Sequence, residues 1–248
     1  MTLKKILEKT KEYLQIPSVV RFEHQFMEHL ADDFSKPNYK VDKQDRFLVV
    51  SKKGKKSGKI LTAHIDRHGI VVNDKGEFEY AAFNAKKHYG DENKSSEAVI
   101  KKAGERFIGE SVINGHLEGK VTSYNFENKD LYFEITGIKA QPGIVLAYKA
   151  PIELVKNGKV SGQIDNTISA AVAYQLVEDG FDGRIIFATE EEIGRSWKHI
   201  ADYLNSLGKP SQEIITLDTT SYDNERAVDE GLIVLRNKDE KGRFNPNL

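Results

Sequence analysis

The feature that most constrains the fold is an alternation of strands and helices in the second half of the sequence. Two runs, GRIIFATE at 183–190 and EIITLDTT at 213–220, are predicted to be buried strands because they are apolar along their length. Helices are predicted beside them, within SGQIDNTISAAVAYQLVEDG at 161–180 and GRSWKHIADYLNSLG at 194–208. Apolar strands that alternate with helices are typical of a parallel α/β sheet.

The beginning of the chain also favours an α/β domain. Amphipathic helices are predicted at 3–14, ended by Pro17, and at about 22–35, followed by strands at 46–51 and 59–64. The residues expected to face inward from the helix after Asp165 are Ile168, Ala171, Val172, Tyr174 and Leu176.

The middle of the chain has a different pattern. GIVVN, EFEYAAF, RFIGESV, DLYFEITGI and GIVLAYK are short runs with strand character, separated by Gly, Asn and Lys turns. We therefore expect an α/β catalytic domain formed by residues 1–68 and 156–248, with residues 69–155 inserted as a β-rich domain. The last run, GLIVLRNKDEKGRFNPNL, predicts a strand, a loop and the opening of a helix, so the α/β domain is expected to be incomplete at its C-terminus.

Composition limits the ligands and partners of such a protein. The chain has 248 residues and a formal net charge of −1, without the basic excess typical of nucleic-acid-binding proteins. It has no cysteine, so metal ligands must be His, Asp or Glu, which suit zinc, cobalt or manganese. No apolar stretch has the length of a signal-peptide core or a membrane span, and we expect a cytoplasmic protein without membrane contact.

Polar residues collect where the predicted parallel strands end, which is the edge at which open α/β sheets bind ligands. They are His64 with Asp66, Asp165 with Asn166, Glu191 with Glu192, and Asp218. Each group alone has an ordinary explanation, such as a helix cap at Asp165 or a solvated turn at the glutamates. Together at one edge they would repel one another, and two divalent ions bridged by a shared carboxylate would neutralise them.

The segments that carry these residues resemble the tetrahedral aminopeptidases, also called glutamyl aminopeptidases (metallopeptidase family 42). AHIDRHG is similar to their His-x-Asp-x-x-Gly motif, GQIDN to their bridging-aspartate motif, TEEEIG to their Glu-Glu-(Val/Ile)-Gly motif, and LDTT to their later aspartate. The order and spacing of the motifs and the β-rich insertion between the first two extend the similarity over almost the whole chain. AHIDRHG, QIDNTIS, GRSW and LDT further resemble a subgroup associated with making the osmoprotectant N-acetylglutaminylglutamine amide.

The resemblance implies a fold and an assembly. The fold would be a phosphorylase/hydrolase-like mixed α/β sheet flanked by helices, of the zinc-exopeptidase type, with an inserted small β-barrel-like domain. The insertion would mediate dimerisation, and the homo-oligomer would range from a dimer to a hollow dodecamer.

The resemblance also implies roles for single residues. Asp165 would bridge two divalent metal ions, His64 and Asp218 would complete the first site, and Glu192 would bind the second. Glu191 would be the general base, and Asp66 would orient His64 through its other ring nitrogen. Glu190 is expected to be a solvated neighbour of this pair.

In the family, the second metal takes a further His from a segment near the C-terminus. The sequence has no counterpart of that segment, so this ligand is missing from the pattern. His68 could point into the same cleft, although it is more readily explained as a polar group beside the ligands or the substrate. Arg67 and Arg195 flank the proposed cleft and could hold a substrate carboxylate, or could equally be internal salt-bridge partners. His199 is expected at the surface.

These expectations lead to a metal-dependent aminopeptidase that acts on short peptides or a small N-modified peptide through a water activated by two metals. Two alternatives remain open. One is an N-acyl deacylase or carboxypeptidase that uses the same metals, and the other is a catalytically silent subunit or binding protein that keeps the fold.

Overall fold

The computed structural model describes residues 3–54, 58–81, 101–102, 104–127, 130–149, 153–155, 159–208, 213–219, 238–239 and 242–243. By its contacts the chain divides into two units, Met1–Asp218 and Thr219–Leu248. In the second unit the described residues form an antiparallel pair, β14 (Lys238–Asp239) and β15 (Gly242–Arg243). The strand predicted in GLIVLRN and the helix predicted to open in FNPNL lie outside the described residues.

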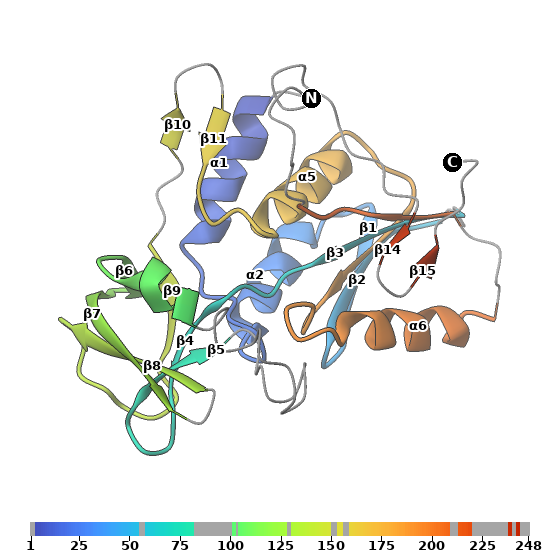
Figure 1. Ribbon diagram of the computed structural model, residues 1–248. Helices are drawn as coiled ribbons and strands as arrows, with labels where there is room; N and C mark the ends of the chain where they lie inside the picture. Colours follow the sequence, from blue (N-terminus) through green and yellow to red (C-terminus); the bar gives the residue numbers. More distant parts are fainter. Residues whose placement is uncertain are drawn as a thin grey trace. The chain divides into compact units, whose positions relative to one another are not determined.

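A five-stranded mixed sheet forms the centre of the first unit (Figure 1). Its strands, in spatial order, are β1 (Tyr39–Lys43), β2 (Phe47–Lys52), β12 (Arg184–Ala188), β3 (Lys59–His64) and β13 (Glu213–Thr216). The three strands β12, β3 and β13 are parallel, as the alternation predicted, whereas β2 and β1 pair in antiparallel fashion. The short β1 was not predicted.

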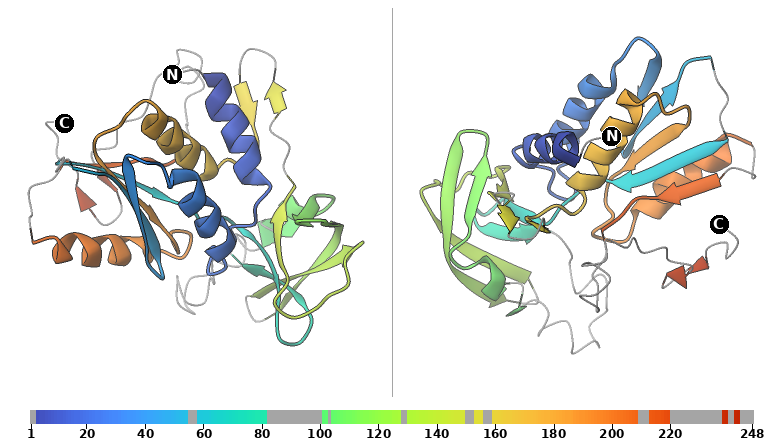
Figure 2. Two further views of the ribbon diagram at one scale, coloured as in Figure 1. Left: turned by 180° about the vertical axis from the view of Figure 1, so that it is seen from behind. Right: turned by 90° about the horizontal axis from the view of Figure 1, so that it is seen from above.

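Helices cover both faces of this sheet (Figures 1 and 2). The helices α1 (Leu3–Leu14), α2 (His24–Phe34) and α5 (Thr167–Glu178) cover one face of the sheet and form the main core with it. The helix α6 (Ser196–Ser206) covers the other face. Alternate side chains of β12 point to opposite faces of the sheet. Ile185 and Phe187 pack in the main core, and Ile186 packs on the side covered by α6.

The prediction for the inward face of α5 was wrong in part. Among the five residues expected inward, Ala171 is fully buried and the other four are partly buried and pack against the main core. The buried residues that were not expected are Thr167, Ser169, Ala170, Ala173, Gln175 and Val177. The helix contacts both α1 and β3, and its small residues allow these neighbours to approach closely.

The β-rich middle is a closed barrel with strand order β4-β5-β8-β7-β6-β9. Its strands are β4 (Gly69–Val72), β5 (Phe78–Ala81), β6 (Ser111–Asn114), β7 (Leu117–Glu127), β8 (Asp130–Thr136) and β9 (Val145–Tyr148). The prediction of a strand over RFIGESV was wrong at its start, because residues 104–107 are helical and bring Phe107 into the barrel core. The long β7 was not predicted. A separate two-stranded ribbon joins β10 (Glu153–Val155) and β11 (Lys159–Ser161).

The prediction that EIITLDTT is a buried strand was wrong. Ile214 and Ile215 on β13 are 43% and 46% exposed. Within the described residues β13 is an edge strand that pairs only with β3, and all four of its residues are exposed.

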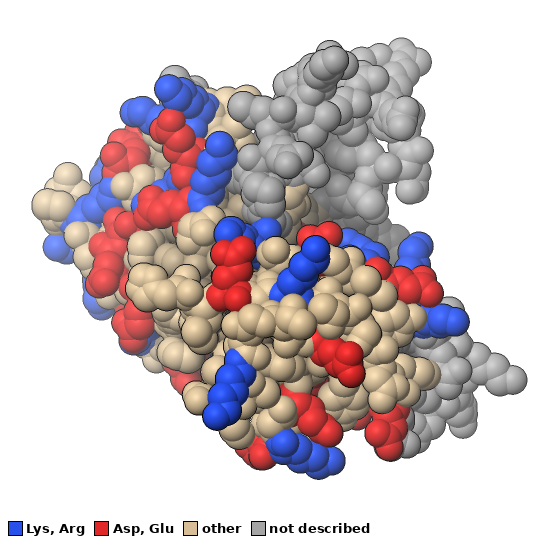
Figure 3. Space-filling view, turned by 90° about the vertical axis from the view of Figure 1, so that its left-hand side faces the viewer, with Lys and Arg blue, Asp and Glu red and all other residues tan. Residues whose placement is uncertain are grey.

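The surface carries charges of both signs. On the face shown in Figure 3, acidic and basic side chains of the described residues are interspersed without a continuous patch of either sign. No helix within the described residues has the length and apolarity needed to cross a membrane.

Candidate metal centre

Strand register brings the predicted site residues to one edge of the sheet. Ala188 is the register partner of His64, so the chain after β12 leaves the sheet beside this histidine. Thr216 is the partner of Thr62, and two further residues along each strand bring Asp218 level with His64. Asp165 precedes α5 in the loop that reaches the same edge, where its peptide bond to Asn166 is cis. These are the carboxyl ends of three parallel strands, where open α/β sheets place their ligand sites.

Three of the predicted metal ligands come together. The Nε2 atom of His64 lies 3.2 Å from Oδ1 of Asp165 and 3.3 Å from Oδ1 of Asp218, and ligand atoms of the three lie within 4.8 Å of one another. Ligand atoms bound tetrahedrally at about 2.0–2.1 Å from zinc are about 3.3 Å apart. The observed spacing therefore fits one ion held by these three side chains.

His64 uses its two ring nitrogens for different contacts. Its Nδ1 atom lies 3.2 Å from the backbone oxygen of Asp66 and 3.6 Å from the Asp66 carboxylate, which leaves Nε2 facing Asp165 and Asp218. Burial alone would lower the pKa of His64, but hydrogen bonds to Asp165, Asp218 and Asp66 raise it well above its usual value. The expected orienting contact from residue 66 is present, with the backbone oxygen closer than the carboxylate.

Asp66 has a second contact that the sequence did not indicate. Its carboxylate is fully buried and accepts the backbone N–H of Glu191 at 3.0 Å and of Glu192 at 2.9 Å. The residue thus connects the loop after β3 to the turn that carries the two glutamates.

Glu191 lies at the margin of the three-residue group. Its Oε2 is 3.9 Å from Nε2 of His64, and its side chain is 42% exposed. Burial raises the pKa of Glu191 to about 7, assisted by Glu192, Asp218 and Asp66 and opposed by His64. A bound cation nearby would lower this pKa.

Glu192 is joined to a chain of hydrogen bonds that reaches the barrel. Its Oε2 accepts a bond from Nε2 of His68 at 2.5 Å, and the Tyr80 hydroxyl of β5 donates to Nδ1 of His68 at 2.6 Å. Among the described residues, Glu192 and His68 are not part of a group of three possible metal ligands.

The expectation that Glu190 is a solvated neighbour was wrong. Its side chain is 7% exposed, with Oε1 3.4 Å from Nη1 of Arg46 and Oε2 3.1 Å from Nε2 of His199. The side chain of His199 is only partly exposed because it contacts Glu190. The guanidinium groups of Arg21 and Arg46 therefore balance the charge of Glu190, and Glu190 is not one of the proposed metal ligands.

The two candidate substrate-binding arginines lie in different surroundings. Arg67 is 1% exposed, donating from Nε to Oγ of Ser18 at 2.8 Å and from Nη2 to the oxygen of Ile16 at 2.5 Å. Burial lowers its pKa to about 10. This location favours a structural role over contact with a substrate. Arg195 is exposed at the start of α6, and no ionic partner for it occurs in the part of the chain that the structure describes.

A second group with metal-ligating side chains lies on the helices. Glu12, His29 and Asp33 also have ligand atoms within 4.8 Å of one another. The ammonium group of Lys9 is 2.8 Å from both carboxylates, so a cation of the protein already balances this group.

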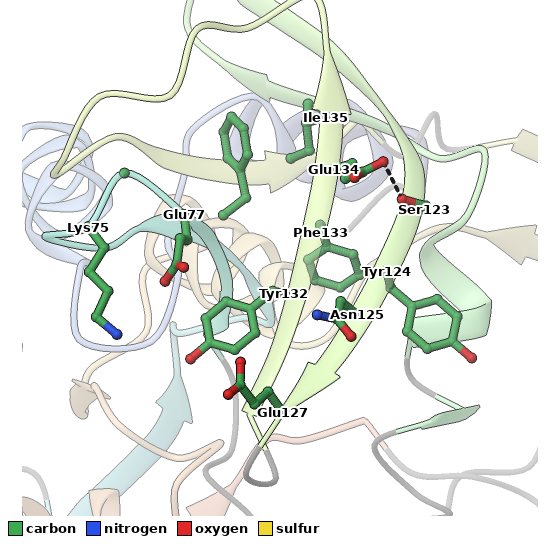
Figure 4. A pocket seen from close by; sticks show the side chains of 12 residues that line it. Lys75, Glu77, Ser123, Tyr124, Asn125, Glu127, Tyr132, Phe133, Glu134 and Ile135 are labelled. Atoms are coloured by element: carbon green, nitrogen blue, oxygen red, sulfur yellow. Dashed lines mark hydrogen bonds between the residues drawn. The ribbon is translucent and has the colours of Figure 1, made fainter.

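A hollow of about 740 Å³ lies on the barrel, away from these groups. Figure 4 shows Tyr132, Glu77 and Lys75 at this hollow, with Ser123 donating to Glu134 at 2.6 Å. It is lined by the turn between β4 and β5 and by residues of β5, β7 and β8, and it contains none of the proposed ligands.

Sequence reasoning missed Tyr80 and Glu23. No sequence signal connects Tyr80 to His68, because their contact depends on where the barrel strand lies. Glu23 had a signal, since it lies three residues before Phe26 and four before Met27, on the inward face of the predicted helix. A carboxylate at such a position marks a buried polar contact.

Comparison by sequence finds no relative, since no protein-family model and no curated protein matches the chain. Solved structures match in fold. An endoglucanase from Thermotoga maritima is 17% identical with a TM-score of 0.59, over 88% of this chain and 68% of its own. The TET1 peptidase of Pyrococcus horikoshii is 20% identical with a TM-score of 0.57, over 86% and 68%.

An aminopeptidase from the archaeon Desulfurococcus kamchatkensis, APDkam598, is 15% identical with a TM-score of 0.61, over 88% of this chain and 63% of its own. At these identities the likeness establishes the fold. The expected mixed α/β fold with an inserted barrel-like sheet is confirmed. The chain spans 63% to 68% of the length of these three proteins.

Proposed function

We propose that this chain is a metal-dependent aminopeptidase of the tetrahedral aminopeptidase family that removes N-terminal residues from short peptides. The observation that carries the proposal is the convergence of His64, Asp165 and Asp218, with ligand atoms within 4.8 Å of one another and Glu191 beside them. Solved structures of the same fold, including one titled a TET1 peptidase and one an aminopeptidase, support the reaction class.

The proposed site would hold divalent ions through carboxylates and imidazole. His64, Asp165 and Asp218 would hold one ion, and Asp165 with Glu192 would contact a second, with zinc, cobalt or manganese as candidates. When bound, such ions lower the pKa of a water molecule and polarise a peptide carbonyl. A metal is thus the part of the chemistry that the side chains alone do not supply.

Glu191 would be the group that moves the proton. Its carboxylate lies beside the ligand group without belonging to it, and its backbone is held by Asp66. In this position it would accept a proton from the attacking water and deliver it to the leaving amine. Asp66 would act on the site by holding both His64 and the Glu191 backbone.

An assembly and a domain arrangement belong to the same proposal. A related solved structure is described as a dodecamer, and TET1 of Pyrococcus horikoshii as a tetrahedron or an octahedral shell. We propose that residues 1–68 and 156–248 form the catalytic domain and that residues 69–155 mediate a homo-oligomer. Mass determination by light scattering, with and without divalent metal, tests this.

The substitution Glu191→Gln tests the proposed reaction. It should leave metal binding unchanged and lower peptide hydrolysis by about 10²–10⁴-fold, because the amide cannot accept the proton. Metal content by elemental mass spectrometry and release of the N-terminal residue are measured together. Glu213→Gln, which removes an exposed carboxylate from β13, is the control. Wild-type rates in Glu191→Gln would show that another group is the base.

The substrate end that the site recognises separates this proposal from its alternatives. Peptides with free amino, acylated amino and blocked carboxyl termini should show cleavage only with a free amino terminus. Cleavage of an acyl group, including that of a small N-modified peptide, would favour a deacylase, and dependence on a free carboxyl terminus a carboxypeptidase. A protein that binds metal and cleaves none of these would favour the silent subunit.

A further inference from the structure

The turn that carries the glutamates is held through its backbone N–H groups. Thr189 donates to the oxygen of Arg46 at 3.1 Å, and Glu191 and Glu192 donate to the carboxylate of Asp66. The remaining N–H, that of Glu190, donates to Oε1 of Glu23 at 3.4 Å. Three successive amides are thus held by two buried carboxylates from distant parts of the chain.

Glu23 holds a second backbone N–H with the same oxygen. Its Oε1 also accepts the N–H of Arg21 at 2.8 Å. Arg21 and Glu190 have φ angles of 71° and 62°, and they are the non-glycine residues with positive φ in the described ranges. Residues other than glycine rarely adopt this left-handed backbone conformation, and it persists only where surrounding contacts hold it. One carboxylate oxygen therefore contacts both of these unusual positions.

The surroundings of Glu23 indicate that these contacts are its role. The residue is 3% exposed at the N-cap of α2, yet its side chain makes no capping bond to that helix. No ion pair with a basic side chain is seen for it among the described residues. Burial, with the nearby charge of Asp66, raises the pKa of Glu23 to about 7. Burying a carboxyl group without a basic partner is unfavourable. The hydrogen bonds that Glu23 accepts from the backbone N–H groups of Arg21 and Glu190 account for its position.

We propose that Glu23 is a positioning residue which, together with Asp66, fixes the backbone of the Glu190–Glu192 turn and so sets the direction of the Glu191 and Glu192 carboxylates. The effect on catalysis rests on the proposed function, whereas the effect on the turn does not. A carboxylate 167 residues away in sequence thus reaches the reacting groups only through the backbone that carries them.

Amide hydrogen exchange, resolved by residue with NMR, tests the contact directly. In Glu23→Leu, which removes the acceptor, exchange at Glu190 and Arg21 should rise by about 10-fold or more, while Thr189 stays protected by Arg46. Glu23→Gln keeps an acceptor oxygen and should restore protection. Leu30→Val, a buried change on the same helix away from the turn, is the matched control.

Kinetics give the second readout. Glu23→Leu should lower kcat by about 10–100-fold with KM nearly unchanged, because misplaced groups lose transition-state contacts, and Glu23→Gln should stay within about threefold of wild type. If Glu23→Leu does not fold, Glu23→Asp withdraws the carboxyl group by one methylene and takes its place.

The outcomes separate the two proposals. Exchange at Glu190 in Glu23→Leu equal to that in Leu30→Val, or no recovery in Glu23→Gln, overturns the positioning role. If no variant cleaves peptides, wild type included, the proposed function fails while the exchange result still decides the role of Glu23.

Discussion

Three adjacent glutamates show how surroundings decide what one residue type does. Glu190 is buried against Arg46 and His199, Glu191 is partly exposed with a pKa raised to about 7, and Glu192 accepts a short bond from His68. Their chemistry is identical in the unfolded chain. The different roles proposed for them follow from the direction in which the turn sends each side chain.

His64 gives a prediction at the same scale. Its raised pKa means that the protonated ring stabilises the metal-free fold below the unfolded pKa of about 6.5, and that this contribution is lost as the pH rises through the higher folded pKa. Zinc must displace that proton, so at pH 7 His64 should release about one proton per ion at the first site, in addition to the fraction that Glu191 releases as the ion lowers its pKa.

Calorimetry in two buffers of different ionisation enthalpy measures this release. The number of protons released per ion should fall as the pH is raised, because His64 is then already neutral before the ion binds. Absence of proton release at pH 7 would show that His64 is neutral in the metal-free protein. His64→Gln, which has no titrating ring, should lose the proton that His64 releases and most of the affinity.

At the scale of elements, the site is a product of strand register. His64, the end of β12 and Asp218 become neighbours because three parallel strands end at the same level. Loops then add Asp165 and the glutamate turn. The barrel contributes through one strand, since Tyr80 of β5 donates its hydroxyl to His68.

Two tyrosines of the barrel test that contribution. Both rings lie against Phe107, but the Tyr80 hydroxyl bonds His68 whereas the buried Tyr148 hydroxyl has no hydrogen-bond partner in the described structure. Tyr80→Phe should therefore lower the free energy of unfolding by about 1 kcal/mol, and Tyr148→Phe should be neutral or stabilising.

Urea unfolding measures both variants. The NMR chemical shifts of the His68 ring nitrogens should change in Tyr80→Phe and not in Tyr148→Phe, because only Tyr80→Phe removes the partner of Nδ1. Equal effects of the two substitutions on stability would mean that the Tyr80–His68 bond contributes nothing measurable.

At the scale of the molecule, a metal at the proposed site would connect segments far apart in the chain. His64, Asp165 and Asp218 come from β3, the loop before α5 and the end of β13. An ion that binds only when these segments are together stabilises the folded state. At 100 times its Kd it should add about 2.7 kcal/mol to the free energy of unfolding.

Thermal unfolding with and without zinc measures this effect. His64→Ala should abolish the stabilisation, whereas His29→Ala should leave it unchanged, because Lys9 already balances the Glu12–His29–Asp33 group. Loss of the effect in His29→Ala would place the ion on the helices and contradict the proposed centre.

The sequence by itself predicted most elements of the α/β part and limited the chemistry of a possible site. Apolar periodicity is local, so α1, α2, α5, α6 and the parallel strands could be predicted from their own residues. The absence of cysteine and the four polar groups at strand ends likewise limited the candidate ligands to His, Asp and Glu.

The tertiary structure decided burial and contact between distant residues. The exposure of β13, the two-sided packing of α5, the burial of Glu190 and Arg67, and the bonds of Glu23 and Tyr80 each depend on a partner far away in the sequence. A residue type records what a side chain can bond, whereas its partner is fixed only when the strands and helices pack. This is why candidate ligands could be proposed from the sequence, whereas the contacts of Glu23 and Tyr80 could not.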